Sequence, residues 1–116
     1  IIVTNQSGIQ RGYYSLLDYT NICIYMLEEF KKKGIDIEIR ACPHRPETIC
    51  NCRKPKTGMF LDERHRDDIM IGDQNSDMLA AKNAGIQNRW LLSENVISEF
   101  ATKQFLSHDH LIEYLM

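Results

Sequence analysis

The stretch Ile69-Met-Ile-Gly72-Asp73-Gln-Asn-Ser-Asp77-Met-Leu-Ala-Ala-Lys-Asn-Ala-Gly85 decides the fold class. Its first three residues form a short apolar run that ends at a Gly-Asp pair, which predicts a buried strand. Ser76 or Asp77 is a suitable N-cap for a helix that continues to Ala84, and Gly85 is a suitable C-terminal stop. Asn88–Leu92 then predicts a second strand. The order strand, helix, strand is typical of a parallel sheet covered by helices.

The preceding residues repeat this order. Ile1–Thr4 is apolar and β-branched and predicts a strand that enters a polar loop. Apolar side chains then recur at helical spacing over residues 16–30, and Lys31–Gly34 closes that helix with cations and a glycine. Ile35–Ile39 alternates as a strand. We therefore expect an α/β fold, a Rossmann-like parallel sheet with helices on both faces. Shorter helices are predicted at Met59–His65 and near His110–Leu115.

Length and composition limit the classes of function. A chain of 116 residues with 43% hydrophobic residues is suited to one domain, so we expect residues 1–116 to form a single domain. The net charge of −2 gives no basic surface for nucleic acid or a membrane. The apolar runs are too short to span a bilayer. We expect a monomer in the cytoplasm, where thiols stay reduced.

Three cysteines and a histidine gather in Cys42-Pro-His44-Arg-Pro-Glu-Thr-Ile-Cys50-Asn-Cys52. Thiolate and imidazole are the ligands that suit zinc, and four of them close a tetrahedral site. The spacing folds one loop, inserted after a strand, around one ion. Because a closed four-ligand site leaves no open position, we expect this zinc to be structural and not catalytic.

Free or disulfide-bridged thiols are the alternative to zinc. Cysteines can act as small buried hydrophobes, and compact sets of them can form a disulfide framework. Cys50 and Cys52 flank a single residue, which is too tight for an easy mutual bridge, and the loop around them is polar. Cys23 lies within an apolar helical pattern and is predicted to be a core residue.

Polar groups follow two of the predicted strands. Asp73 lies at the end of a buried strand, where a carboxylate can bind magnesium, and Asp77 can cap the helix or support the site. Thr4 and Asn5 offer a hydroxyl and backbone N–H groups to an anion. Ordinary turn chemistry is the alternative in both places.

The zinc loop leads directly into Arg53-Lys54, two cations suited to phosphate recognition, with a solvated surface pair as the alternative. In open parallel sheets, ligands bind beyond the carboxyl ends of the strands. Thr4, the cations that follow the zinc loop and Asp73 would all lie at that edge. We therefore expect a magnesium site that faces a phosphate site.

These motifs, in this order, carry a family resemblance. They are Thr4-Asn-Gln-Ser-Gly-Ile-x-Arg11-Gly-Tyr13, Cys42-Pro-His44, Cys50-x-Cys52-Arg-Lys54-Pro-x-x-Gly58-Met59 and Ile71-Gly-Asp73-x-x-x-Asp77-Met-x-Ala-Ala-x-x-Ala-Gly85. Over residues 1–92 the chain resembles the zinc-containing phosphatases of the haloacid dehalogenase superfamily. Within them the likeness is to the heptose bisphosphate phosphatases, with the histidinol-phosphate phosphatases as near relatives. The resemblance implies magnesium-dependent hydrolysis of a sugar phosphate through an aspartyl-phosphate.

The resemblance also implies roles for individual residues. Thr4 would bind the transferring phosphoryl group, Lys54 would offset its charge, and Asp73 would be a magnesium ligand supported from behind by Asp77. Phosphoryl transfer needs this positioning and neutralisation of charge. The residues expected to contact substrate are Asn5, Gln6, Ser7, Arg11, Arg53 and Lys54.

The sequence departs from the family pattern in one major respect. The family's first motif, Asp-x-Asp-Gly-Thr, supplies the nucleophile, and these 116 residues contain no Asp-x-Asp. We expect the chain to be incomplete at its N-terminus, lacking a central strand, and inactive alone. A non-catalytic, zinc-stabilised module for a phosphorylated ligand or a protein is the alternative. Gln74 also stands where the family usually has a basic residue, and the segment between Gly58 and Ile69 is shorter than the family pattern.

Overall fold

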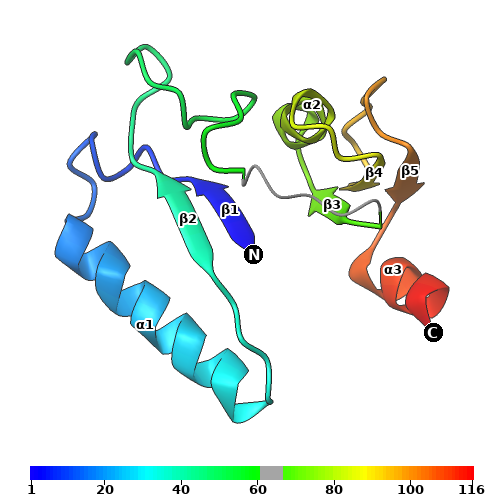
Figure 1. The fold of residues 1–116 in the computed structure, drawn as a ribbon, viewed down its shortest axis with the longest axis horizontal. Coiled ribbons are helices and arrows are strands. Elements are labelled where there is room, and N and C mark those ends of the chain that lie inside the picture. Colours follow the sequence, from blue (N-terminus) through cyan, green and yellow to red (C-terminus); the bar gives the residue numbers. More distant parts are fainter. Residues whose placement is uncertain (61–66) are drawn as a thin grey trace. The chain divides into compact units, whose positions relative to one another are not determined.

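A computed structural model describes residues 1–60 and 67–116 (Figure 1). The chain divides into two compact units, Ile1–Arg53 and Lys54–Met116, and each is described by itself. Both units are α/β with parallel strands, as the sequence predicted. Among the described residues, no helix is both long and apolar enough to cross a membrane.

The first unit is a strand–helix–strand segment. Strands β1 (Ile2–Asn5) and β2 (Ile39–Cys42) pair in parallel, and helix α1 (Leu16–Lys32) connects them. The register pairs Ile2 with Ile39 at one end and Asn5 with Cys42 at the other. Because the strands are parallel and in step, the loop after β1 and the loop after β2 leave the same edge of this sheet.

Helix α1 ends at the predicted cations and glycine, whereas the capping box at its start was not predicted. The Ser15 hydroxyl accepts from the backbone N–H of Asp18 at 2.9 Å, and the Asp18 carboxylate accepts from the N–H of Ser15 at 3.1 Å. This reciprocal capping box fixes the start of the helix. Lys31 and Lys32 lie in its last turn, and Gly34 has a φ of +76°, which favours glycine.

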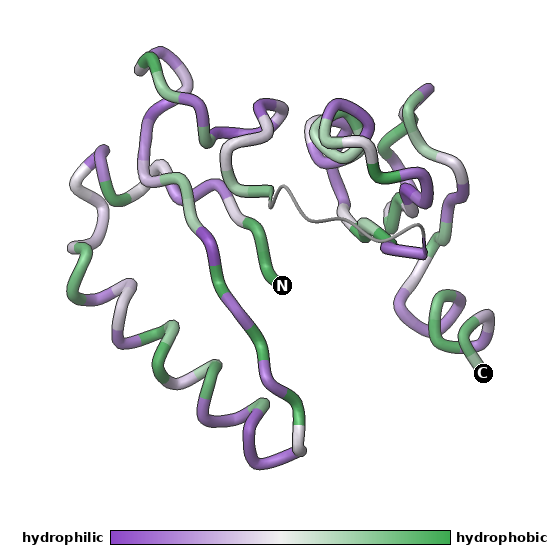
Figure 2. Tube along the Cα trace, in the orientation of Figure 1, coloured by the Kyte–Doolittle hydropathy of each residue, from purple (hydrophilic) through white to green (hydrophobic). Residues whose placement is uncertain are grey.

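The predicted core position of Cys23 is wrong. None of the residues of α1, all within the described part of the chain, is fully buried, and Cys23 is only partly so. Figure 2 shows apolar and polar residues alternating along this helix. Within the first unit, a sheet of two short strands is too narrow to cover the whole apolar side of a helix of 17 residues.

The second strand of this unit lies further along the chain than predicted. The alternation of Ile35–Ile39 predicts a strand, but β2 spans Ile39–Cys42. Pairing with β1 decides its position, because Asn5 matches Cys42 and the N–H of Ile2 donates to the carbonyl of Glu38 at 2.8 Å. Alternation marks residues that can form a strand, whereas the partner strand determines which of them do.

The second unit contains a three-stranded parallel sheet in the order β3-β4-β5. The strands are β3 (Ile69–Gly72), β4 (Asn88–Leu92) and β5 (Lys103–Phe105), and the helices are α2 (Asn75–Asn83) and α3 (His108–Leu115). The strands β3 and β4 and the C-terminal helix were predicted, whereas β5 was missed. Its three residues include two exposed polar side chains, which give no apolar pattern. The expected burial of β3 is wrong for the described residues, because Ile69 and Ile71 are 45% and 43% exposed. Trp90, Phe105 and Leu111 pack together as a core cluster.

The N-terminus of α2 differs from the prediction. Neither Ser76 nor Asp77 is the N-cap, because the helix begins at Asn75 and Gln74 occupies the cap position. Asp77 instead lies in the first turn, where its carboxylate faces back toward the strand exit. Gly85 follows the end of the helix with a φ of +86°, as predicted. Most of the predicted helix Met59–His65 lies outside the described residues, and its first two residues are not helical.

Candidate functional site

The four predicted zinc ligands lie together in the first unit. Cys42 ends β2 and is fully buried, and His44, Cys50 and Cys52 follow in the next loop and are half-buried. The ligand atoms of all four lie within 4.8 Å of one another. The Cys42 sulfur is 3.3 Å from Nδ1 of His44 and 3.8 Å from the Cys50 sulfur. Nδ1 of His44 is also 3.2 Å from the Cys52 sulfur.

This geometry fits a tetrahedral metal ion. With Zn–S bonds of about 2.3 Å, two sulfurs on one zinc lie about 3.8 Å apart. The Cys42–Cys50 separation matches that value. The cysteines are free thiols, which excludes the alternative of a disulfide in this structure. The chain therefore carries a Cys₃His site of the kind that holds structural zinc, as predicted.

The pKa values of two thiols of the cluster are shifted in opposite directions. The backbone N–H of Arg53 donates to the Cys50 sulfur and lowers the pKa of that thiol to about 6. Burial, followed by the neighbouring Cys42 and Cys50 sulfurs, raises the pKa of Cys52 to about 12. Three sulfurs cannot all carry a negative charge at this spacing without a cation, which a zinc ion would supply.

Arg53 is positioned by the zinc loop. Its side chain is half-buried, and Nη1 donates to the carbonyl of His44 at 3.5 Å. Its backbone N–H donates to the sulfur of Cys50, one of the four cluster residues. The guanidinium is thus held beside the metal site, and its predicted contact with substrate stays a prediction.

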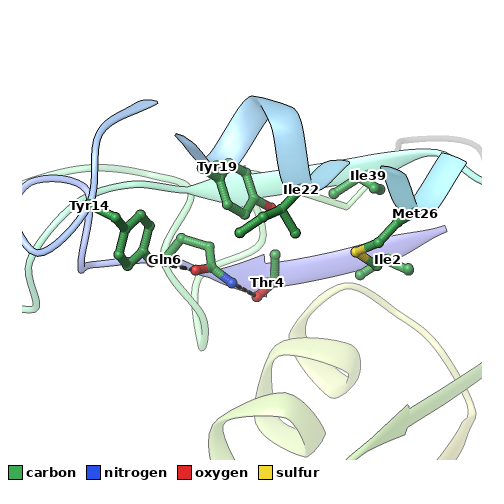
Figure 3. A pocket seen from close by; sticks show the side chains of 8 residues that line it. All are labelled: Ile2, Thr4, Gln6, Tyr14, Tyr19, Ile22, Met26 and Ile39. Atoms are coloured by element: carbon green, nitrogen blue, oxygen red, sulfur yellow. Dashed lines mark hydrogen bonds between the residues drawn. The ribbon is translucent and has the colours of Figure 1, made fainter. Parts of the chain in front are cut away.

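A network of side-chain hydrogen bonds covers the end of β1. The Gln6 amide donates to the Thr4 hydroxyl at 2.8 Å, and the Tyr14 hydroxyl donates to the Gln6 carbonyl oxygen at 2.5 Å (Figure 3). Ser7 accepts from Nε of Arg11 at 3.2 Å in the exposed turn that follows. Asn5, Gln6, Ser7 and Arg11, the predicted substrate contacts of this loop, therefore lie in one continuous segment after Thr4.

Gln10 joins this segment to the zinc loop. Its side-chain oxygen accepts from the backbone N–H of Arg45 and, at 2.9 Å, from the Thr48 hydroxyl. Its own backbone N–H donates to the carbonyl of Pro43 at 3.3 Å. The N–H of Gln6 also donates to the carbonyl of Cys42 at 2.7 Å. The loop after β1 and the zinc loop are thus one hydrogen-bonded assembly. Sequence reasoning missed Gln10, because an exposed glutamine in a loop gives no signal.

A cavity of about 320 Å³ lies in the first unit, lined by side chains of β1, α1 and β2 (Figure 3). Most of its lining is apolar, and only the end formed by Thr4, Gln6 and Tyr14 carries hydrogen-bonding groups in the network above. Tyr19 also lines it, and burial together with the Cys23 thiol raises the pKa of its hydroxyl. The apolar part of this cavity, lined by Ile2, Ile22, Met26 and Ile39, does not suit a sugar phosphate.

Lys54 and Asp77 form a buried ion pair in the second unit. Nζ of Lys54 lies 2.5 Å from Oδ1 of Asp77, and their side chains are 10% and 7% exposed. Oδ2 of Asp77 accepts from the backbone N–H groups of Asp73 and Gln74, both at 3.1 Å. Both oxygens of this carboxylate are therefore engaged within the protein, and the Lys54 ammonium is held at a fixed point.

Asp73 is the exposed carboxylate at the end of β3. The backbone turns tightly here, since a Cβ on Gly72 would lie 2.5 Å from Cβ of Asp77. A hard cation such as Mg²⁺ is bound through one or two carboxylates, substrate phosphate oxygens and waters. Asp73 is accessible, and both oxygens of the nearby Asp77 already have partners within the protein. Asp73 therefore fits this mode of Mg²⁺ binding.

The structure brings together two subsets of the predicted site. Thr4, its loop, the zinc ligands and Arg53 belong to the first unit, and Lys54, Asp73 and Asp77 belong to the second. The convergence of both subsets on one crevice stays a prediction.

Comparison with known proteins identifies the class. A family profile described as HAD-hydrolase-like matches residues 51–113, more than half of the chain. The chain therefore belongs to the HAD-like hydrolases, as its motifs predicted.

Curated relatives place it more narrowly within that class. The chain is 44% identical over 103 residues to D-glycero-beta-D-manno-heptose-1,7-bisphosphate 7-phosphatase of Helicobacter pylori, covering 82% of this chain and 60% of that protein. It is 42% identical over 120 residues to the D-glycero-alpha-D-manno-heptose-1,7-bisphosphate 7-phosphatase of Campylobacter jejuni, covering 97% and 69%. It is also 40% identical to the histidine biosynthesis bifunctional protein HisB of Blochmanniella floridana, covering 75% and 26%. The chain thus spans about 60% of the length of the first of these relatives.

A solved structure supports the same placement. The chain resembles the crystal structure of D,D-heptose 1,7-bisphosphate phosphatase from B. bronchiseptica complexed with magnesium and phosphate. The TM-score is 0.73 at 28% sequence identity, covering 97% of this chain and 71% of that one. This likeness extends the family assignment to the fold of nearly the whole chain.

Proposed function

We propose that this chain acts in a magnesium-dependent phosphatase that converts D-glycero-D-manno-heptose 1,7-bisphosphate to the 1-phosphate. This reaction serves the synthesis of heptose precursors of lipopolysaccharide in the cytoplasm. The observation that carries the proposal is the identity of 42% over 97% of the chain with a 7-phosphatase for that substrate. A Cys₃His cluster of reduced thiols is consistent with a cytoplasmic protein.

The described side chains support specific roles in such a reaction. The transferring phosphoryl group carries charge on its oxygens, which positioned donors and cations stabilise. The Thr4 hydroxyl would donate a hydrogen bond to that group, and the Lys54 ammonium, which Asp77 holds in place, would offset its charge. Asp73 would hold Mg²⁺, which supplies charge neutralisation when bound. Asp77 would support the site through the backbone of Asp73.

The remaining predicted contacts would recognise the substrate. Asn5, Gln6, Ser7 and Arg11 follow Thr4 in a loop that the zinc loop holds through Gln10. Arg53 is held beside the metal cluster by its hydrogen bond to the carbonyl of His44. We propose that zinc stiffens this assembly and performs no chemistry, because four protein ligands leave no open position for a reactant.

Phosphate release from purified full-length protein tests the substrate. Heptose 1,7-bisphosphate is assayed as both the α and the β anomer, because the relatives named above include one of each. Histidinol phosphate is the second candidate, favoured by the similarity to HisB. Release from a heptose bisphosphate with Mg²⁺ supports the proposal. Release only from histidinol phosphate replaces it with the second candidate.

A polypeptide limited to residues 1–116 should release no phosphate, because it contains no Asp-x-Asp to supply the nucleophile. The product of the complete open reading frame is the comparison. If that product also lacks an Asp-x-Asp and is inactive with every substrate, the chain is a non-catalytic phosphate-binding or protein-binding module. Size-exclusion chromatography of the same product tests the proposed monomer.

A further inference from the structure

The hydrogen bonds that converge on Thr4 suggest a function for Tyr14, a residue outside the predicted site. Tyr14 lies ten positions after Thr4, and its hydroxyl reaches Thr4 only through the side chain of Gln6. Figure 3 shows the three side chains in line at one end of the cavity. The inference rests on the proposed function, in which the Thr4 hydroxyl donates to the transferring phosphoryl group.

The direction of these bonds determines what Thr4 can do. A threonine hydroxyl has one proton to donate and two lone pairs to accept. The Gln6 amide nitrogen donates to Thr4 at 2.8 Å and cannot accept in return. The Thr4 proton therefore points away from Gln6 and is available to another acceptor. A phosphoryl oxygen is such an acceptor.

The orientation of the Gln6 amide depends in turn on Tyr14. A glutamine amide can rotate by half a turn and exchange its oxygen with its nitrogen. The Tyr14 hydroxyl donates to the Gln6 oxygen at 2.5 Å. A phenol is a stronger donor and a weaker acceptor than an aliphatic hydroxyl, so Tyr14 favours the orientation that places the amide oxygen toward itself and the amide nitrogen toward Thr4. With the amide reversed, the Tyr14 oxygen would accept from the Gln6 nitrogen, and Thr4 would donate its proton to the Gln6 oxygen and lose it for the substrate. We propose that Tyr14 is a positioning residue that, through Gln6, keeps the Thr4 hydroxyl ready to donate to phosphate.

The surroundings of Tyr14 support this role. Its ring is half-buried at the wall of the apolar cavity, where hydrogen bonds are stronger than in water. Gly8 provides room for the ring, because a Cβ there would lie 2.2 Å from one ring carbon and 2.9 Å from the hydroxyl oxygen. Gly8→Ala should therefore displace the end of the Tyr14 side chain. Tyr13, the neighbouring tyrosine, is 75% exposed and serves as a matched control.

The first test is a double-mutant cycle in the full-length enzyme. Tyr14→Phe keeps the ring and removes the donor, so kcat should fall about fivefold, the size typical of one lost hydrogen bond, while KM changes less. Thr4→Val removes the phosphate donor and should lower kcat about 100-fold. In the Thr4→Val background, Tyr14→Phe should have almost no further effect, because residues that act as a unit are not additive.

Gly8→Ala should reproduce the loss seen with Tyr14→Phe, and Tyr13→Phe should match the wild type. If Tyr14→Phe lowers kcat by the same factor with and without the Thr4 hydroxyl, Tyr14 does not act through Thr4 and the proposed positioning role is wrong. A Tyr14→Phe enzyme with wild-type kcat also overturns it.

A second measurement is independent of activity. In NMR spectra, the Gln6 side-chain amide signals should shift in both Tyr14→Phe and Thr4→Val and stay unchanged in Tyr13→Phe. Unchanged Gln6 signals in Tyr14→Phe and Thr4→Val overturn the proposed role of Tyr14. If the wild-type enzyme is inactive but the Gln6 amide signals shift in both Tyr14→Phe and Thr4→Val, the proposed function is overturned. The hydrogen-bonded chain from Tyr14 through Gln6 to Thr4 is then still supported.

Discussion

Asp77 binds Lys54 with one carboxylate oxygen and the exit of β3 with the other. The Lys54 Nζ–Asp77 Oδ1 distance is 2.5 Å, and Oδ2 accepts from the N–H groups of Asp73 and Gln74. One buried side chain therefore fixes both a cation and the backbone that carries the proposed magnesium ligand. Stability and site geometry depend on the same pair.

Removing one partner of this pair should destabilise the fold strongly. Lys54→Met leaves the Asp77 charge buried and without this cation, and Asp77→Asn removes the carboxylate charge that faces Lys54. A broken buried pair typically costs about 3–5 kcal/mol of the free energy of unfolding. Urea denaturation of both single variants and of the double variant measures this cost. The double variant should be less destabilised than the sum of the two single variants.

The surface pair Lys32–Glu29 is the matched control. Its N–O distance is 2.9 Å, but its side chains are 69% and 42% exposed. Water screens such a pair, so Lys32→Met should cost less than about 1 kcal/mol. Equal small costs at Lys54 and Lys32 would show that the Lys54–Asp77 pair is not buried in solution.

The Cys₃His cluster should bind one metal ion per chain. Cys50→Ser removes one ligand and should abolish stoichiometric zinc, measured by mass spectrometry of the metal after gel filtration. Cys23 lies in α1 and outside the cluster, so Cys23→Ser should retain the zinc. Zinc lost from both variants, or retained in both, contradicts the assignment.

Chelation should loosen the zinc loop without removing any metal-hydroxide chemistry. Binding energy at a structural zinc site is folding energy, so a chelator should lower the melting temperature. It should also weaken phosphate binding, because the loop after β1 is tied to the zinc loop. Magnesium is restored after chelation to separate the two metals. Unchanged stability and phosphate binding in the zinc-free protein would contradict a structural role.

Sequence patterns predicted the elements whose signals are local. The cations and glycine that close α1, the glycine after α2 and the span of β4 follow from nearby residues, and the structure agrees with them. The zinc cluster was also predictable, because four ligands within eleven residues can close on one ion whatever the rest of the fold does.

Features that depend on distant partners were not predictable in this way. The position of β2 depends on its register with β1, and β5 has two polar side chains and takes its place beside β4. The sequence predicts Asp77 as a possible N-cap, because a single sequence does not reveal Lys54 as its partner 23 positions away. Gln10 contacts residues 35 and 38 positions away.

Gln10 provides a test of how the two loops of the first unit are joined. Gln10→Ala removes the oxygen that accepts from Arg45 and Thr48, so exchange of backbone amides in residues 6–12 should become faster. Gln10→Glu keeps an acceptor oxygen and is the matched control. Hydrogen exchange measured by mass spectrometry makes the comparison, with α3 as an internal reference. Equal exchange in all three proteins would show that the zinc loop does not hold this segment.

Asp73→Asn tests the proposed magnesium ligand in the full-length enzyme. An amide oxygen is a weaker ligand than a carboxylate for a hard cation, so the Mg²⁺ concentration for half-maximal phosphate release should rise about tenfold or more. The fold should persist, because Asp73 is exposed and its backbone N–H still bonds Asp77. Asp36→Asn removes an equally exposed carboxylate from a loop of the first unit and should leave the magnesium dependence unchanged. A magnesium response in Asp73→Asn that matches Asp36→Asn would exclude Asp73 as a ligand, since removal of a direct ligand lowers the metal affinity.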